Sequence, residues 1–212
     1  PAARIELATQ VAAIVDALVA VPDLATNGRV AASLVRAARR ARALGDLATS
    51  ERAWRAARPC IESSMPDDHV ACLSLLYGLA NVLYELGDLD GSKELELAHL
   101  AVIQRTLADD DPLVLDSRFG LATTLFLLGE LDRARALDDA VLEVWSTRLA
   151  PADRKLVAIR GNLALTCKAF GDIERALALE REIVDALETS AAPDSEDLAR
   201  ARHNLATTYI GL

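Results

Sequence analysis

The sequence predicts an all-α fold, a solenoid of antiparallel helical hairpins, from three observations. Hydrophobic residues make up 52% of the 212 residues but aromatic residues only 4%, a composition that suits helices packed through small side chains. One short turn recurs four times at a constant spacing. No stretch alternates apolar and polar residues as a half-buried strand would.

The recurring turn places a glycine at 45, 87, 129 and 171, 42 residues apart each time, and follows it with an acidic residue. We expect each glycine to end a helix, because the residue after a helix often needs a left-handed backbone that glycine adopts without strain. The acid suits the start of the next helix, where it caps free N–H groups. The turn is therefore the tip of a helical hairpin.

Small residues recur at the same spacing on both sides of this turn, where two antiparallel helices must approach closely. One set is Ala38, Ala80, Ala122, Ala164 and Ala206, and the other is Ser50, Ser92, Ala134 and Ala176.

Segments rich in proline and aspartate separate the hairpins and predict helix ends and restarts, at 66–68, 109–112, 150–153 and 193–196. The expected helices span about 5–20, 28–44, 47–63, 69–86, 89–107, 113–128, 131–148, 153–170 and 173–189, with a last one from about 196. We expect one array over 1–212, with repeats at 28–68, 69–111, 112–152 and 153–194, preceded by 1–27 and followed by the first helix of a further repeat at 195–212.

This pattern resembles the tetratricopeptide repeat, in the long-period variety of kinesin light chains and bacterial regulators. The resemblance lies in Tyr77-Gly78-Leu79-Ala80-Asn81, in the turn at 86–89 with Ser92, in the equivalents 42 and 84 residues later, and in the segment 203–209. It implies a right-handed α-α superhelix. HEAT and armadillo repeats have similar periods and are the structural alternative. The chain departs from the family at Glu96, Asp138 and Glu180, where an aromatic residue is frequent, and at Arg39 and Arg42.

Both ends of the chain fall inside the repeat pattern. Ala3 stands one period before Gly45, and Leu212 one residue before the next glycine is due. We expect a fragment of a longer array, with a native cap at residues 5–20 as the alternative.

The resemblance also implies a concave groove lined by the first helix of each hairpin, with asparagine amides that hydrogen-bond a bound peptide backbone. The middle of the array would offer aromatic residues and its first repeat arginines suited to an acidic partner. The aromatic residues could instead pack between hairpins, and the arginines could instead form a solvated face. The expected groove residues are Arg36, Arg39, Tyr77, Asn81, Tyr84, Phe119, Phe126, Asn162, Lys168, His203 and Asn204.

Charge and composition restrict the classes of partner, the compartment and the source that we expect. A net charge of −9 opposes binding to nucleic acid, and no segment has the pattern of a membrane span or a signal peptide. Three widely spaced cysteines favour a reducing compartment, the cytoplasm. Only three of the 23 basic residues are lysine, an arginine bias common in GC-rich bacterial genomes.

No catalytic, cofactor-binding or metal-binding constellation is recognisable, so we expect no enzyme activity. The sequence predicts a protein-protein interaction scaffold that binds a protein or peptide in its groove, as the sensor or adaptor portion of a larger bacterial protein. The alternative is a self-assembly element that forms homo-oligomers of a multidomain signalling ATPase or peptidase regulator.

Overall fold

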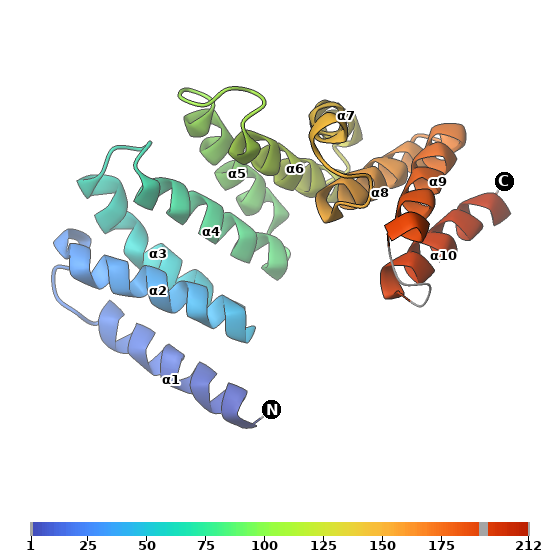
Figure 1. Ribbon diagram of the computed structural model, residues 1–212. Coiled ribbons are helices and arrows are strands. Elements are labelled where there is room, and N and C mark those ends of the chain that lie inside the picture. Colours follow the sequence, from blue (N-terminus) through green and yellow to red (C-terminus); the bar gives the residue numbers. More distant parts are fainter. Residues whose placement is uncertain (1, 191–194, 212) are drawn as a thin grey trace. The chain divides into compact units, whose positions relative to one another are not determined.

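The computed structural model describes residues 2–190 and 195–211 and divides the chain into two compact units, residues 1–108 and 109–212. All regular elements among the described residues are helices, as predicted (Figure 1). The first unit holds α1 (Ala2–Val19), the 3₁₀ turn η1 (Leu24–Thr26), α2 (Gly28–Leu44), α3 (Leu47–Ser64), α4 (Val70–Leu86) and α5 (Leu89–Ile103). The second holds α6 (Pro112–Leu127), α7 (Leu131–Arg148), α8 (Arg154–Ala169), α9 (Ile173–Ser190) and α10 (Glu196–Ile210).

Helix boundaries lie within one residue of the predicted ones at all but two ends. The first helix was expected from 5 and begins at Ala2, and α5 was expected to end at 107 and ends at Ile103. After Ile103 the backbone tightens, since Arg105 and Thr106 donate to the carbonyls of Val102 and Ile103 three residues back. The helix break expected from 193 falls partly on residues 191–194, outside the described part of the chain.

The hairpin turns have the predicted geometry. Gly45, Gly87, Gly129 and Gly171 have φ of 84°, 84°, 78° and 75°, a left-handed conformation that costs L-residues free energy. Three of the four acids cap the next helix: Asp46, Asp88 and Asp172 accept hydrogen bonds from the amides of Thr49, Gly91 and Arg175. Glu130 makes no side-chain capping bond.

The small-residue positions bring the two helices of each hairpin together. Ala38, Ala80, Ala122 and Ala164 are buried. Ser50 Oγ donates to the carbonyl of Ala38 at 2.8 Å, and the equivalent Ser92 donates to Ala80 at 3.0 Å. These bonds tie the second helix to the backbone of the first.

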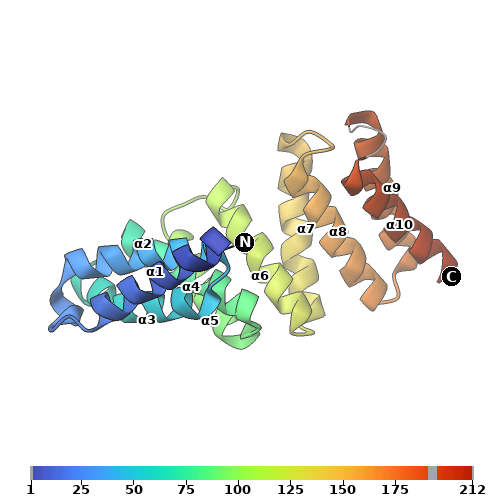
Figure 2. The same ribbon diagram turned by 90° about the horizontal axis from the view of Figure 1, so that it is seen from below.

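Each unit has its own apolar core, formed where successive hairpins stack. In the first unit Leu34, Trp54 and Leu79 are buried among α2, α3 and α4. In the second, Trp145 and Ile159 belong to a cluster between α7 and α8, which lie side by side in Figure 2. Among the helices of the described chain, none is both long and apolar enough to cross a bilayer.

Candidate functional site

A hollow lies in the first unit between α2 and α4, the first helices of successive hairpins, with α3 beneath them. It consists of two cavities of about 580 and about 360 Å³ that share Arg39 and Ser74. We call it the first hollow. Arg39 Nη2 donates to Ser74 Oγ and so links the two walls.

The first hollow combines arginines with apolar surface. Trp54 on α3 is buried at its floor, while Tyr77 on α4 is 54% exposed at its wall. Among the described residues, Arg36 and Arg39 have side-chain hydrogen bonds to serine hydroxyls and no salt bridge to a carboxylate. Arg42 differs, because its Nε donates to Glu85 Oε1 at 2.7 Å. The hollow therefore presents two arginine charges that no carboxylate of the unit neutralises.

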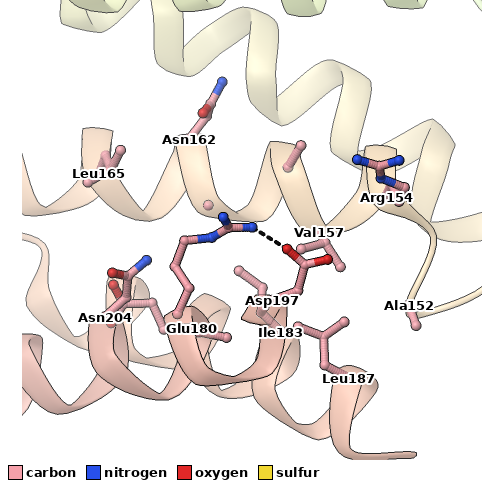
Figure 3. A pocket seen from close by; sticks show the side chains of 14 residues that line it. Ala152, Arg154, Val157, Asn162, Leu165, Glu180, Ile183, Leu187, Asp197 and Asn204 are labelled. Atoms are coloured by element: carbon pink, nitrogen blue, oxygen red, sulfur yellow. Dashed lines mark hydrogen bonds and ion pairs between the residues drawn. The ribbon is translucent and has the colours of Figure 1, made fainter. Parts of the chain in front are cut away.

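A second hollow lies in the second unit between α8 and α10, above α9 (Figure 3). Its volume is about 400 Å³. Eleven of its fourteen lining positions are the positions of the first hollow displaced by three repeats, or 126 residues. The equivalent pairs are Gly28/Arg154, Ala31/Val157, Ala32/Ala158, Val35/Gly161, Arg36/Asn162, Arg39/Leu165, Trp54/Glu180, Ile61/Leu187, Ala71/Asp197, Ser74/Arg200 and Gly78/Asn204.

The second hollow has different chemistry at these equivalent positions. Glu180, only 4% exposed, takes the place of the floor residue Trp54. Lys168 Nζ donates to Glu180 Oε1 at 2.8 Å and to Thr208 Oγ1 at 3.2 Å. At the rim Arg200 pairs with Asp197, the contact drawn as a dashed line in Figure 3. The two hollows therefore share equivalent lining positions but differ in charge.

The structure brings five of the predicted groove residues to these hollows. Arg36, Arg39 and Tyr77 line the first, and Asn162 and Asn204 line the second. The Asn162 amide, however, points away toward α6 (Figure 3), where Nδ2 donates to Thr123 Oγ1 at 3.0 Å.

The other predicted groove residues do not line these two hollows. Asn81 Nδ2 donates to the Tyr77 carbonyl of its own helix. Phe119 packs on Trp145 with ring centroids 5.5 Å apart. Tyr84 and Phe126 are half-buried, Lys168 is occupied by Glu180, and His203 is exposed on α10.

Sequence reasoning did not assign the floor and wall residues Trp54, Ser74 and Glu180 to the groove, whereas Gly161 and Leu165 lie in columns expected to line it. A usable signal was present: Glu180 departs from the family pattern, and Trp54 stands three repeats earlier in the same column. The periodicity shows that these residues occupy the same repeat position. It does not show which way their side chains point, because that depends on how the next hairpin packs over them.

Two titratable groups are perturbed by burial. His99 lies beside Tyr77, with ring centroids 5.8 Å apart, and burial lowers its pKa below the usual value. Burial, helped by the charge of Asp139, raises the pKa of Asp138 to about 7. Asp138 occupies the same repeat position as Trp54 and Glu180.

Comparison with known proteins identifies the same repeat architecture. Residues 74–137 and 117–189, together more than half of the chain, match a family model described as tetratricopeptide repeat. No curated protein shows a significant sequence match.

Several solved structures have a similar fold. A kinesin light chain-like repeat protein described as from Podosopora anserina has a TM-score of 0.74 at 21% identity, over 86% of each chain. BtubC (BKLC) from P. vanneervenii has a TM-score of 0.73 at 17% identity, over 98% of this chain and 82% of that one. YrrB, described as a tetratricopeptide protein with an unusual peptide-binding site, has a TM-score of 0.55 at 15% identity, over 84% and 75% of the two chains.

Proposed function

Because this chain belongs to the tetratricopeptide repeat family, we propose that it is an interaction scaffold that holds an extended segment of a partner polypeptide in the hollows between the first helices of its hairpins. One observation carries the proposal. Each unit has a hollow of this kind, and eleven lining positions of one are equivalent to those of the other, although the side chains at these positions differ. A concave surface with apolar walls and a few polar groups is the usual form of a binding site.

The first hollow favours an acidic segment. Arg36 and Arg39 carry charges that no carboxylate of the unit neutralises, and planar guanidinium groups bind carboxylates in a bidentate manner. Tyr77 adds an exposed ring of the kind enriched at binding hot spots. We expect an acidic residue close to an apolar one in the bound segment.

In this proposal the array has no catalytic role and is the sensor or adaptor portion of a larger bacterial protein, in the cytoplasm. The arginine bias supports a bacterial source, and the three buried free cysteines support a reducing compartment. The peptide-binding site named for YrrB supports peptide binding as a use of this fold.

Selection from a displayed library of random peptides tests the proposal. Wild-type protein should enrich peptides with acidic residues, and Arg36→Ala with Arg39→Ala should weaken their binding by roughly tenfold, because each lost charged hydrogen bond contributes about 1.5–3 kcal/mol before solvent screening.

The matched control is Arg55→Ala with Arg58→Ala. These two exposed arginines on α3 already pair with Glu51 and Glu62, so their removal should leave peptide binding unchanged. If both double variants lose peptide binding equally, the loss is due to the change in net charge, and a site in the first hollow is contradicted. Light scattering over a dilution series separates partner binding from the self-assembly alternative.

A further inference from the structure

One repeat position that lines the second hollow lacks a side chain. In that column the chain carries Val35, Tyr77 and Phe119, but Gly161 on α8. A Cβ atom added at Gly161 would meet no atom within 4 Å. The space that a large residue occupies in the other repeats is therefore available here.

Glu180 adds a polar group that needs a hydrogen-bond donor. Its Oε1 accepts from Lys168, whereas its Oε2 is buried and has no hydrogen-bond partner among the described residues. A buried ion pair is favourable only when the remaining lone pairs also find donors. A donor supplied by a partner would meet this requirement.

The charges around the hollow disfavour an ionic ligand. Lys168 balances Glu180, Arg200 balances Asp197, and the exposed Arg154 remains at the rim. A second cation beside Oε2 would therefore meet no net negative field, and a carboxylate would be repelled by Oε2 itself. Val157, Ile183 and Leu187 supply apolar walls. These features fit an uncharged donor on an apolar body.

Asn204 lines the second hollow together with Glu180. It occupies the position equivalent to Gly78, which lies directly against the floor residue Trp54 in the first hollow. Asn204 is exposed on α10. Because Glu180 lines the hollow as well, a group bound there lies beside Glu180.

We infer that the second hollow binds an uncharged hydrogen-bond donor carried on an apolar ring, the phenol of a partner's tyrosine, with Glu180 Oε2 as the acceptor and Gly161 providing the space. This specificity rests on the proposed scaffold function. It differs from that of the first hollow, whose arginines favour an acidic group.

Four small probes with the same ring test the inference by titration of the methyl-labelled 212-residue protein, followed by NMR at Val157, Leu165 and Ile183. They are p-cresol, 4-methylanisole, p-toluate and 4-methylbenzylammonium. We expect p-cresol to bind in a saturable manner, and 4-methylanisole, which lacks the donor, to bind about tenfold more weakly. The anionic and cationic probes should bind more weakly than p-cresol.

Two substitutions examine the roles of the two residues. Gly161→Phe should abolish p-cresol binding, whereas Gly161→Ala should retain it. Glu180→Gln should reverse the preference toward 4-methylanisole, because Lys168 retains the amide oxygen and the amide NH₂ then faces the hollow. Glu182→Gln, the same change at an exposed position of α9 paired with Arg160, should have no effect. Melting curves identify any variant that has lost its fold.

The inference is overturned if p-cresol does not bind, if 4-methylanisole binds equally well, if either charged probe binds most tightly, or if folded Gly161→Phe binds p-cresol as wild type does. Any of these results leaves the peptide selection on the first hollow intact, so failure of this inference is distinguishable from failure of the scaffold proposal.

Discussion

Gly78 on α4 lies directly on the indole of Trp54, so closely that a Cβ atom at Gly78 would stand 2.2 Å from Trp54 Cζ2. The helix of one hairpin thus rests on the floor residue of the preceding hairpin without a side chain between them. Trp54 is only 1% exposed, so its ring has little room to move.

We therefore expect Gly78→Ala to destabilise the protein by about 1–3 kcal/mol through overpacking. Gly161→Ala is the matched control, since it is the same change on a first helix with open space around the new methyl group. It should stabilise the protein by about 0.5–1 kcal/mol through helix propensity. Urea denaturation of both variants measures the difference, and equal effects would show that the contact with Trp54 does not limit the packing.

The pair formed by Lys168 and Glu180 provides a second prediction. Lys168→Met leaves the carboxylate of Glu180 buried without its cation, which should destabilise the protein by about 1–3 kcal/mol, below the range for fully buried pairs because Lys168 is 28% exposed. Adding Glu180→Gln should recover part of the loss. A double-mutant cycle measured by denaturation gives the coupling, and additive effects would contradict an energetically significant pair.

The raised pKa of Asp138 should make the free energy of unfolding depend on pH. Its pKa is raised from 3.8 to about 7 in the folded protein by burial, so the folded state binds more protons than the unfolded state between these values. Stability from this group is present at low pH and is lost as pH rises from about 4 to 7.

Asp138→Asn should therefore stabilise the protein at pH 8 by about 2–4 kcal/mol relative to wild type, and the difference should disappear near pH 4. Glu143→Gln is the control, since it removes an acidic group at an exposed position of the same helix. Denaturation curves at pH 4, 6 and 8 check the prediction, and a constant difference between wild type and Asp138→Asn would rule out titration as its cause.

The hairpin turn gives a fourth prediction. Gly129 has φ of 78°, and a Cβ atom added there would meet no atom within 4 Å, so a substitution tests backbone strain without a clash. Gly129→Val should destabilise the protein by about 1–3 kcal/mol. Gly161→Val, on a helix with φ in the ordinary range and equally open space, should change stability by less than about 0.5 kcal/mol, because valine is at least as good a helix former as glycine. Thermal melting compares them, and equal losses would attribute the effect to the β-branched side chain rather than to the turn.

The sequence by itself determined the helical hairpins, because their signals are local. Glycine at 45, 87, 129 and 171 has the left-handed backbone that the spacing predicts, and Ser50 and Ser92 face the carbonyls of the small-residue column. The end of α5 was misjudged, since the tightening after Ile103 leaves no distinct residue signal.

Tertiary structure alone decided which side chains form a site. Asn81 and Lys168 occupy repeat positions expected to face the groove. However, Asn81 donates a hydrogen bond to the backbone of its own helix, and Lys168 donates one to Glu180. Conversely, Trp54 and Glu180 lie on second helices and become hollow floors only because the next hairpin packs over them. Period and turn chemistry fix the backbone, whereas the direction and partner of a side chain depend on packing between repeats, which no single repeat contains.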